Sequence, residues 1–214
     1  KDIAAFHQAI NIAVEQAQEG KLAIFGILPT SPNTGYGYIK SSTAINQFTC
    51  KVESFVEKPD LKSAEVFIEE GNYLWNSGMF IFKADTLIDE LTVYGNDIIN
   101  VVKKSVDNAV RDFDFIRLEK DTFELSSNDS IDCVLMEKSD KVVVVSLDAG
   151  WTDIGSWSKL YNIGMTDKDG NVIQGDVFAE DTFNSYIHAN HHMVATIGIK
   201  DLVIVDTPNV TLVS

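Results

Sequence analysis

Residues 141–157 read KVVVVSLDAGWTDIGSW, and the fold class follows from the way this stretch begins. Four consecutive valines favour a strand, because β-branched side chains suit a pleated surface. The run has no polar alternation, which is typical of a strand that is buried on both faces. We therefore expect a buried strand over 142–147, followed by a polar loop that carries Asp148 and Asp153.

The residues before this strand alternate between helical and extended patterns. Apolar residues at helical spacing predict a helix over 2–19, with Asp2 as its N-cap and Gly20 as its C-terminal stop. Residues 96–138 show a helical pattern with breaks, the last helix beginning near Ser130. The other predicted elements are strands over 22–28, 36–39, 52–56 and 78–82 and helices over 61–70 and 85–91. This alternation predicts an α/β layer structure with a largely parallel or mixed sheet.

The composition changes after about residue 165. Beyond the turn-rich stretch at 167–171, short apolar runs are separated by Gly, Asn, Asp and Pro, and no long helical period is present. We therefore divide the chain into an α/β domain over 1–165 and an all-β extension over 166–214, either a small sheet or the start of a β-solenoid. Apolar edges in 172–214 favour self-association, for example as a homodimer.

The charge balance and the cysteines exclude several classes of protein. The chain has 17 basic and 32 acidic residues, a net charge of −15. General nucleic-acid binding is not expected, because Lys and Arg on phosphates drive it. No membrane partner is expected either, since no apolar run approaches about 20 residues and no signal peptide is visible. Cys50 and Cys133 have no CxxC spacing, which favours a reducing, cytoplasmic location.

Two glycine- or charge-bearing segments lie at predicted strand ends. In TGYGYI at 34–39, Gly37 would let the backbone approach either a ligand or a neighbouring strand. In FVEKP at 55–59, the Glu57 carboxylate could accept hydrogen bonds from sugar hydroxyls, and Lys58 could contact a phosphate. A surface ion pair before a turn explains Glu57 and Lys58 equally well.

Two further polar segments leave similar alternatives open. Asn76 in LWNSGMF at 74–80 offers a donor and an acceptor, which suits a hydroxyl-rich ligand or a turn before a strand. Asp153 precedes a predicted helix, so it could be an N-cap. It could also bind Mg²⁺, which prefers oxygen ligands and bridges to substrate phosphates.

The four segments, in this order, resemble those of the sugar-1-phosphate nucleotidyltransferases, and in particular the bacterial mannose-1-phosphate guanylyltransferases. The resemblance covers nearly the whole chain and includes two later stretches, DGN at 169–171 with Gly175-Asp176, and VATIG at 194–198 with DLVIV at 201–205. It implies an incomplete Rossmann-like nucleotide-diphospho-sugar transferase sheet with helices on both faces, followed by a small β-solenoid-like extension.

The resemblance also implies a reaction and a role for each residue. The reaction is transfer of GMP from GTP to mannose 1-phosphate, with release of pyrophosphate. Gly37 would bring its backbone to the sugar, Glu57 and Asn76 would bind the sugar, and Lys58 would bind its phosphate. Asp153, as the implied catalytic residue, would hold Mg²⁺ against the phosphates.

One departure from the family is plain in the residues. Members carry a Gly-rich nucleotide-binding loop of the form G-G-x-G-T-R-L-x-P, and no such run occurs in the 214 residues. We therefore expect a fragment that is inactive alone, with a second metal-binding Asp lying before Lys1 and, in some members, an isomerase domain following. The alternatives are a sugar-1-phosphate nucleotidyltransferase with another substrate and a non-catalytic, sugar-binding regulatory subunit.

Overall fold

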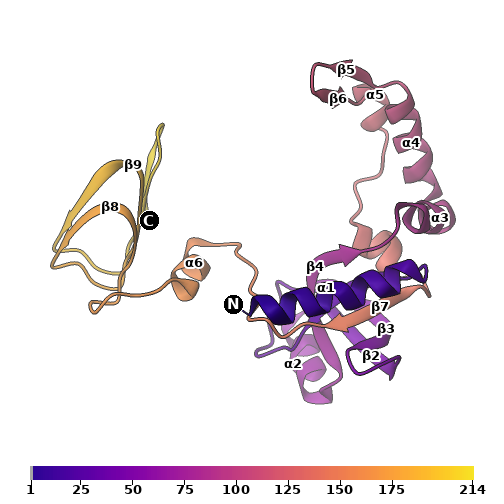
Figure 1. The fold of residues 1–214 in the computed structure, drawn as a ribbon, viewed down its shortest axis with the longest axis horizontal. Coiled ribbons are helices and arrows are strands. Elements are labelled where there is room, and N and C mark those ends of the chain that lie inside the picture. Colours follow the sequence, from indigo (N-terminus) through magenta and orange to yellow (C-terminus); the bar gives the residue numbers. More distant parts are fainter. Residues whose placement is uncertain (1) are drawn as a thin grey trace. The chain divides into compact units, whose positions relative to one another are not determined.

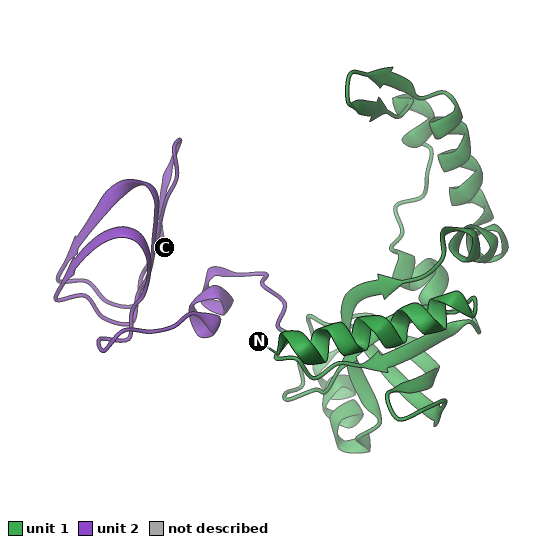
Figure 2. Cartoon of the chain, in the orientation of Figure 1, with its two compact units in different colours: residues 1–151 green, residues 152–214 purple. Residues whose placement is uncertain are grey.

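The computed structural model describes residues 2–214, and the chain forms two compact units, residues 1–151 and residues 152–214 (Figure 2). Within residues 2–214, no helix is both long enough and apolar enough to cross a membrane.

The first unit contains a five-stranded sheet with helices packed against it and a separate two-stranded sheet (Figure 1). Its elements in chain order are α1 (Ile3–Gln18), β1 (Leu22–Ile27), β2 (Tyr38–Ala44), β3 (Thr49–Val56), α2 (Leu61–Glu70), β4 (Tyr73–Ile81), α3 (Ala84–Tyr94), α4 (Asn96–Asp107), β5 (Val110–Asp112), β6 (Phe115–Arg117), α5 (Lys120–Phe123), a π-helical turn η1 (Asp132–Met136) and β7 (Val142–Ser146).

The five strands close on themselves in the order β1-β4-β2-β3-β7. β7 completes the closure, because it pairs in parallel with β1 and antiparallel with β3. The other three pairings are antiparallel, so the sheet is mixed. The α/β class is as predicted, but the expected Rossmann-like sheet is instead a closed barrel among the residues described.

Helices cover the sheet on two sides. All six residues of β1 are buried, as are Val142 to Val145 of β7. Alternate side chains of these strands enter two apolar clusters: one includes residues of α1 and α2, and the other includes residues of α3 and η1. The unbroken valine run thus predicted correctly that both faces of this strand are covered.

An ion pair fixes α3 to the segment that leads into β7. Lys141 Nζ lies 2.8 Å from Glu90 Oε1, and the Ser139 hydroxyl donates a hydrogen bond to Glu90 Oε2. Burial raises the pKa of Glu90, but the bonds from Lys141 and Ser139 outweigh it and hold that pKa below its usual value. The turn η1, which directly precedes this segment in the chain, packs in the same apolar cluster as α3.

Two predictions about local structure were wrong. β4 begins at Tyr73 rather than at Gly78, so Asn76 lies inside the strand and not in a turn before it. Within residues 96–138, where the sequence predicted only helices separated by breaks, β5 and β6 form a two-stranded hairpin. Phe113 in the turn of this hairpin has φ of 54° and is 98% exposed, so no buried face marks the hairpin in the sequence.

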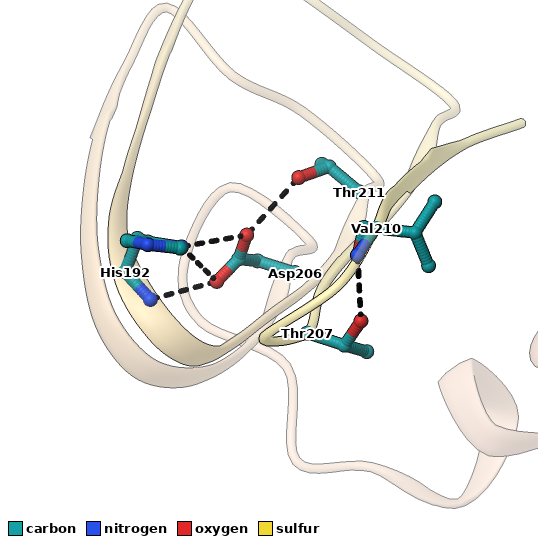
Figure 3. Close-up of polar contacts among 5 residues, drawn as sticks. All are labelled: His192, Asp206, Thr207, Val210 and Thr211. Carbon is teal, nitrogen blue, oxygen red and sulfur yellow. Dashed lines mark hydrogen bonds and ion pairs between the residues drawn. The ribbon is translucent and has the colours of Figure 1, made fainter.

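The second unit contains α6 (Trp157–Ile163) and a four-stranded sheet of β8 (Val172–Glu180), β9 (Tyr186–Ile197), β10 (Val203–Asp206) and β11 (Thr211–Val213). β9 pairs in parallel with β8 and with β10, and β11 is antiparallel to β10. The buried Asp206 accepts hydrogen bonds from the His192 backbone N–H and from the Thr211 hydroxyl (Figure 3). The all-β character predicted from the sequence is confirmed for residues 172–214.

Candidate sugar-phosphate site

The register of three strands brings Gly37, Glu57 and Asn76 together. Tyr38 of β2 is paired with Val56 of β3 and with Trp75 of β4. One step further along both ladders, Gly37 therefore lies opposite Glu57 and opposite Asn76. The Asn76 backbone N–H donates to the Gly37 carbonyl at 2.7 Å, which confirms the contact.

Gly37 leaves no room for a side chain. A Cβ atom there would lie 2.6 Å from Glu57 Oε2, 3.2 Å from Phe55 Cζ and 3.3 Å from Asn76 Cβ. The Glu57 carboxylate thus occupies the space that a Cβ at this position would fill. Glycine lets Glu57 keep this place, and a larger residue would have to displace the carboxylate.

Lys58 and Glu57 carry opposite charges at the end of β3. Their Nζ and Oε1 atoms lie 3.2 Å apart, and the Lys58 side chain is 65% exposed whereas that of Glu57 is 25% exposed. Lys58 has φ of 46°, a left-handed conformation that few residues other than glycine adopt. Such strained positions persist where the surrounding structure holds them and are frequent in ligand sites. The ion pair that was the alternative interpretation is present, and the Lys58 ammonium is also exposed to solvent, where an anion can reach it.

Asn76 has two partners that fix the orientation of its amide. Its Oδ1 accepts a hydrogen bond from the Gly78 N–H at 3.1 Å, and its Nδ2 donates to Asp132 Oδ1 at 3.0 Å. Gly78 has φ of 72°, so the strand bends at the residue that binds this amide. Asn76 can still donate one N–H and accept one hydrogen bond, which is what a sugar hydroxyl needs.

Asp132 is a residue of this site that the sequence analysis missed. It is half-buried at the start of η1, in contact with Asn76 and near Glu57. Burial, and then the negative charge of Glu57, raise the pKa of Asp132, while the bond from Asn76 and the charge of Lys58 oppose that rise. The only signal in the sequence is that an acidic residue directly precedes the apolar stretch 133–136. In the structure this residue begins a π-helical turn, and such turns are frequent at functional sites.

Three aromatic rings pack together in the apolar cluster that includes residues of α1 and α2. The Tyr36 ring lies 5.0 Å from that of Trp75 and 5.8 Å from that of Trp151, both edge to face. Tyr36 and Trp75 directly precede Gly37 and Asn76, so their packing fixes the backbone on which those two residues lie. Among residues 2–214, the buried Trp75 Nε1 has no hydrogen-bond partner.

Asp153 belongs to the second unit and has a different environment. Its Oδ2 lies 3.3 Å from Lys159 Nζ, and its side chain is 52% exposed. Asp153 is not the N-cap of α6, because Ser156 takes that position and accepts from the Lys159 N–H. The N-cap alternative is thus wrong. The Asp153 carboxylate instead faces solvent and forms an ion pair with Lys159. Within the described residues, no group of three or more His, Cys, Asp and Glu side chains could hold a metal ion.

Comparison with protein families gives two matches along the chain. Residues 1–170 match the family described as nucleotidyl transferase, and residues 175–214 match the MannoseP isomerase/GMP-like beta-helix domain. The two matches follow the same order as the α/β and all-β parts of the structure.

Comparison with individual proteins agrees with the family match. The whole chain is 44% identical to a mannose-1-phosphate guanylyltransferase of Escherichia coli and 44% identical to the xanthan biosynthesis protein XanB of Xanthomonas campestris, covering 47% and 45% of those proteins. It therefore spans about half the length of the curated relatives it matches. A solved structure, the mannose-1-phosphate geranyltransferase from Thermus thermophilus, matches the whole chain with a TM-score of 0.79 and 30% identity, over 61% of its own length. The chain therefore belongs to the nucleotidyl transferase family.

Proposed function

We propose that this chain provides the sugar-phosphate side of a mannose-1-phosphate guanylyltransferase, which transfers GMP from GTP to mannose 1-phosphate and releases pyrophosphate. The observation that carries the proposal is the meeting of Gly37, Glu57, Lys58 and Asn76 at one end of the sheet. The names of the relatives support this substrate, and that of XanB supports a role in polysaccharide biosynthesis.

The chemistry asks the chain's residues mainly to position the sugar phosphate. An oxygen of its phosphate attacks the α-phosphorus of GTP in line, and the bond from that phosphorus to pyrophosphate breaks. Glu57 and Asn76 fix the sugar by accepting and donating hydrogen bonds to hydroxyls. Lys58 places a positive charge beside the attacking phosphate, which lowers the repulsion between two anionic reactants.

The reaction would also use a divalent cation, Mg²⁺ in our proposal, which would supply positive charge to the phosphates. Asp153 suits the way that Mg²⁺ binds in such enzymes, through one or two carboxylates together with substrate phosphates. Its side chain is about half exposed and forms an ion pair with Lys159, so solvent can reach the carboxylate. We assign Asp153 as one metal ligand and the catalytic residue.

We further propose that residues 1–214 alone do not catalyse the transfer, because they contain no G-G-x-G-T-R-L-x-P loop to orient the triphosphate. We retain a boundary near residue 165, a β-solenoid-like extension, a homodimer and a cytoplasmic location as parts of the same proposal. An assay of this chain with GTP, mannose 1-phosphate and Mg²⁺ should show binding of the sugar phosphate without turnover.

The variant Lys58→Ala tests the proposed function. Loss of one charge-assisted contact should weaken mannose 1-phosphate binding about 10- to 150-fold, corresponding to about 1.5–3 kcal/mol, as measured by titration calorimetry. Stability should change little, since Ala at φ of 46° has the same backbone cost as Lys. Lys62→Ala, an exposed lysine in the first turn of α2, is the matched control. Unchanged affinity in Lys58→Ala would reduce Glu57 and Lys58 to a surface ion pair.

A further inference from the structure

Asp132 is held in surroundings that are unfavourable for a carboxylate. It is half-buried, the carboxylate of Glu57 is among the charges that act on it, and its one side-chain partner among residues 2–214 is the amide of Asn76. The hydrogen bond from Asn76 occupies Oδ1, and the other hydrogen bond that acts on this carboxylate comes from the backbone N–H of Asp132 itself. Two donors leave several acceptor positions of a half-buried carboxylate unfilled, and such a group gains when a further donor binds to it.

The chemistry of the neighbours indicates what supplies that donor. A cation would have to approach past the ammonium of Lys58, whose positive charge also acts on Asp132. A second anion would be repelled by Glu57 and Asp132 together. A neutral hydroxyl group can donate to Oδ2 without either conflict, and Asn76, which is bound to Asp132, can accept from or donate to the neighbouring hydroxyl.

We propose that Asp132 is a fifth substrate-binding residue, which accepts a hydrogen bond from a sugar hydroxyl through Oδ2 while Oδ1 holds the Asn76 amide in place. This inference rests on the proposed function, because it assumes that a sugar phosphate occupies the site. Asp132 and Glu57 then approach the sugar from different elements, η1 and the end of β3. Two carboxylates presented in this way can bind two hydroxyls and so distinguish sugars that differ at one of them.

The raised pKa of Asp132 agrees with this role. Desolvation and repulsion from Glu57 make the ionised carboxylate a cost to the folded protein, and that cost is relieved when a hydroxyl donates to it. Asp132→Asn should consequently leave the thermal midpoint at neutral pH unchanged or raise it, because the amide needs no counter-charge and can still accept from Asn76.

The decisive experiment uses titration calorimetry to measure the affinity of the parent protein and of Asp132→Asn for mannose 1-phosphate. The same measurement is made with its 2-, 3-, 4- and 6-deoxy analogues. We expect Asp132→Asn and Asp132→Ala to bind mannose 1-phosphate about 10- to 100-fold more weakly. One deoxy analogue should bind the parent protein weakly and should lose nothing further in either variant, because the hydrogen bond is already absent. Asp129→Asn, an exposed aspartate three residues earlier, is the control and should match the parent protein.

Each other outcome overturns the inference and separates it from the proposed function. Equal losses for mannose 1-phosphate and for all four deoxy analogues would show that Asp132 acts only through the fold or through Asn76. Unchanged affinity in Asp132→Asn would show that it does not contact the sugar, even if Lys58→Ala weakens binding as proposed. Absence of binding to the parent protein would instead refute the proposed function itself.

Discussion

At the scale of single residues, the site depends on Gly37 as much as on its charged neighbours. Several glycines of this chain have a positive φ, but Gly37 is explained by the carboxylate that fills the place of its missing side chain. The strand register at Tyr38, Val56 and Trp75 fixes that geometry before any ligand arrives. Because the site is already formed, little binding free energy is lost to rearrangement when a ligand binds.

Gly37→Ala should therefore weaken sugar-phosphate binding more than it lowers stability. The new methyl group would lie 2.6 Å from Glu57 Oε2, so the carboxylate must turn away, which a flexible side-chain end can do at small cost. We expect about a tenfold or greater loss of mannose 1-phosphate affinity by calorimetry, the effect of about one lost hydrogen bond to a charged group. The thermal midpoint should fall only slightly.

Gly35→Ala is the matched control for this variant. Its Cβ would meet only the Asn33 side chain, at 3.2 Å, and it lies in the same loop. If both alanine variants bind like the parent protein, Glu57 does not hold the sugar. If Gly37→Ala unfolds the protein, the position serves packing against Phe55 rather than the site.

At the scale of secondary-structure elements, the sequence predicted those that carry local signals. Asp2 caps α1 through the Ala5 N–H, Asp60 caps α2, and Gly71 ends α2 with φ of 73°. The start of β4 could not be predicted in the same way. Trp75 and Asn76 are extended because they pair with β1 and β2, partners from distant parts of the chain. The β5–β6 hairpin was missed because it has no buried face.

The strands of the second unit should show a pH dependence that comes from Asp206. The backbone N–H of His192, at 2.7 Å from Oδ2, is the main cause that lowers the pKa of Asp206 to about 2, and the Thr211 hydroxyl and the His192 ring add to it. The folded pKa lies below the value of about 3.9 for an unfolded aspartate. Its stabilising effect is thus fully present above about pH 4 and is lost as the pH falls towards 2.

Asp206→Asn should remove this dependence. In the parent protein, the protection of β9 and β10 amides against hydrogen exchange should fall between pH 4 and 2. In the variant, this protection should fall less steeply. The asparagine keeps an acceptor for the His192 N–H, so the strands should still form. Asp176→Asn, an exposed aspartate of β8, should behave as the parent protein does. Identical pH profiles for the parent and Asp206→Asn would contradict the assignment.

At the scale of the whole molecule, the candidate site was predicted where motifs lie on one sheet and missed where they do not. Gly37, Glu57 and Asn76 come from strands whose pairing brings them together, so motif order along the chain was enough to nominate them. Asp132 joins them through a π-helical turn 56 residues beyond Asn76, a distance that no local pattern spans. Asp153 lies in the other compact unit, so its role can be tested only in the function of the protein as a whole.

Asp153→Asn in the full-length protein separates a metal ligand from a structural residue. The change keeps the shape of the side chain and removes its charge. Its ion pair with Lys159 is exposed, and such pairs contribute about 0–1 kcal/mol, so the thermal midpoint should hardly move. If Asp153 binds the metal, kcat should fall about 100-fold or more, the scale of losing one preorganised electrostatic contact. The exposed Asp201→Asn in the same unit should leave both quantities unchanged. A marked fall in midpoint with a preserved rate per folded molecule would make Asp153 structural, and the metal would then need other ligands.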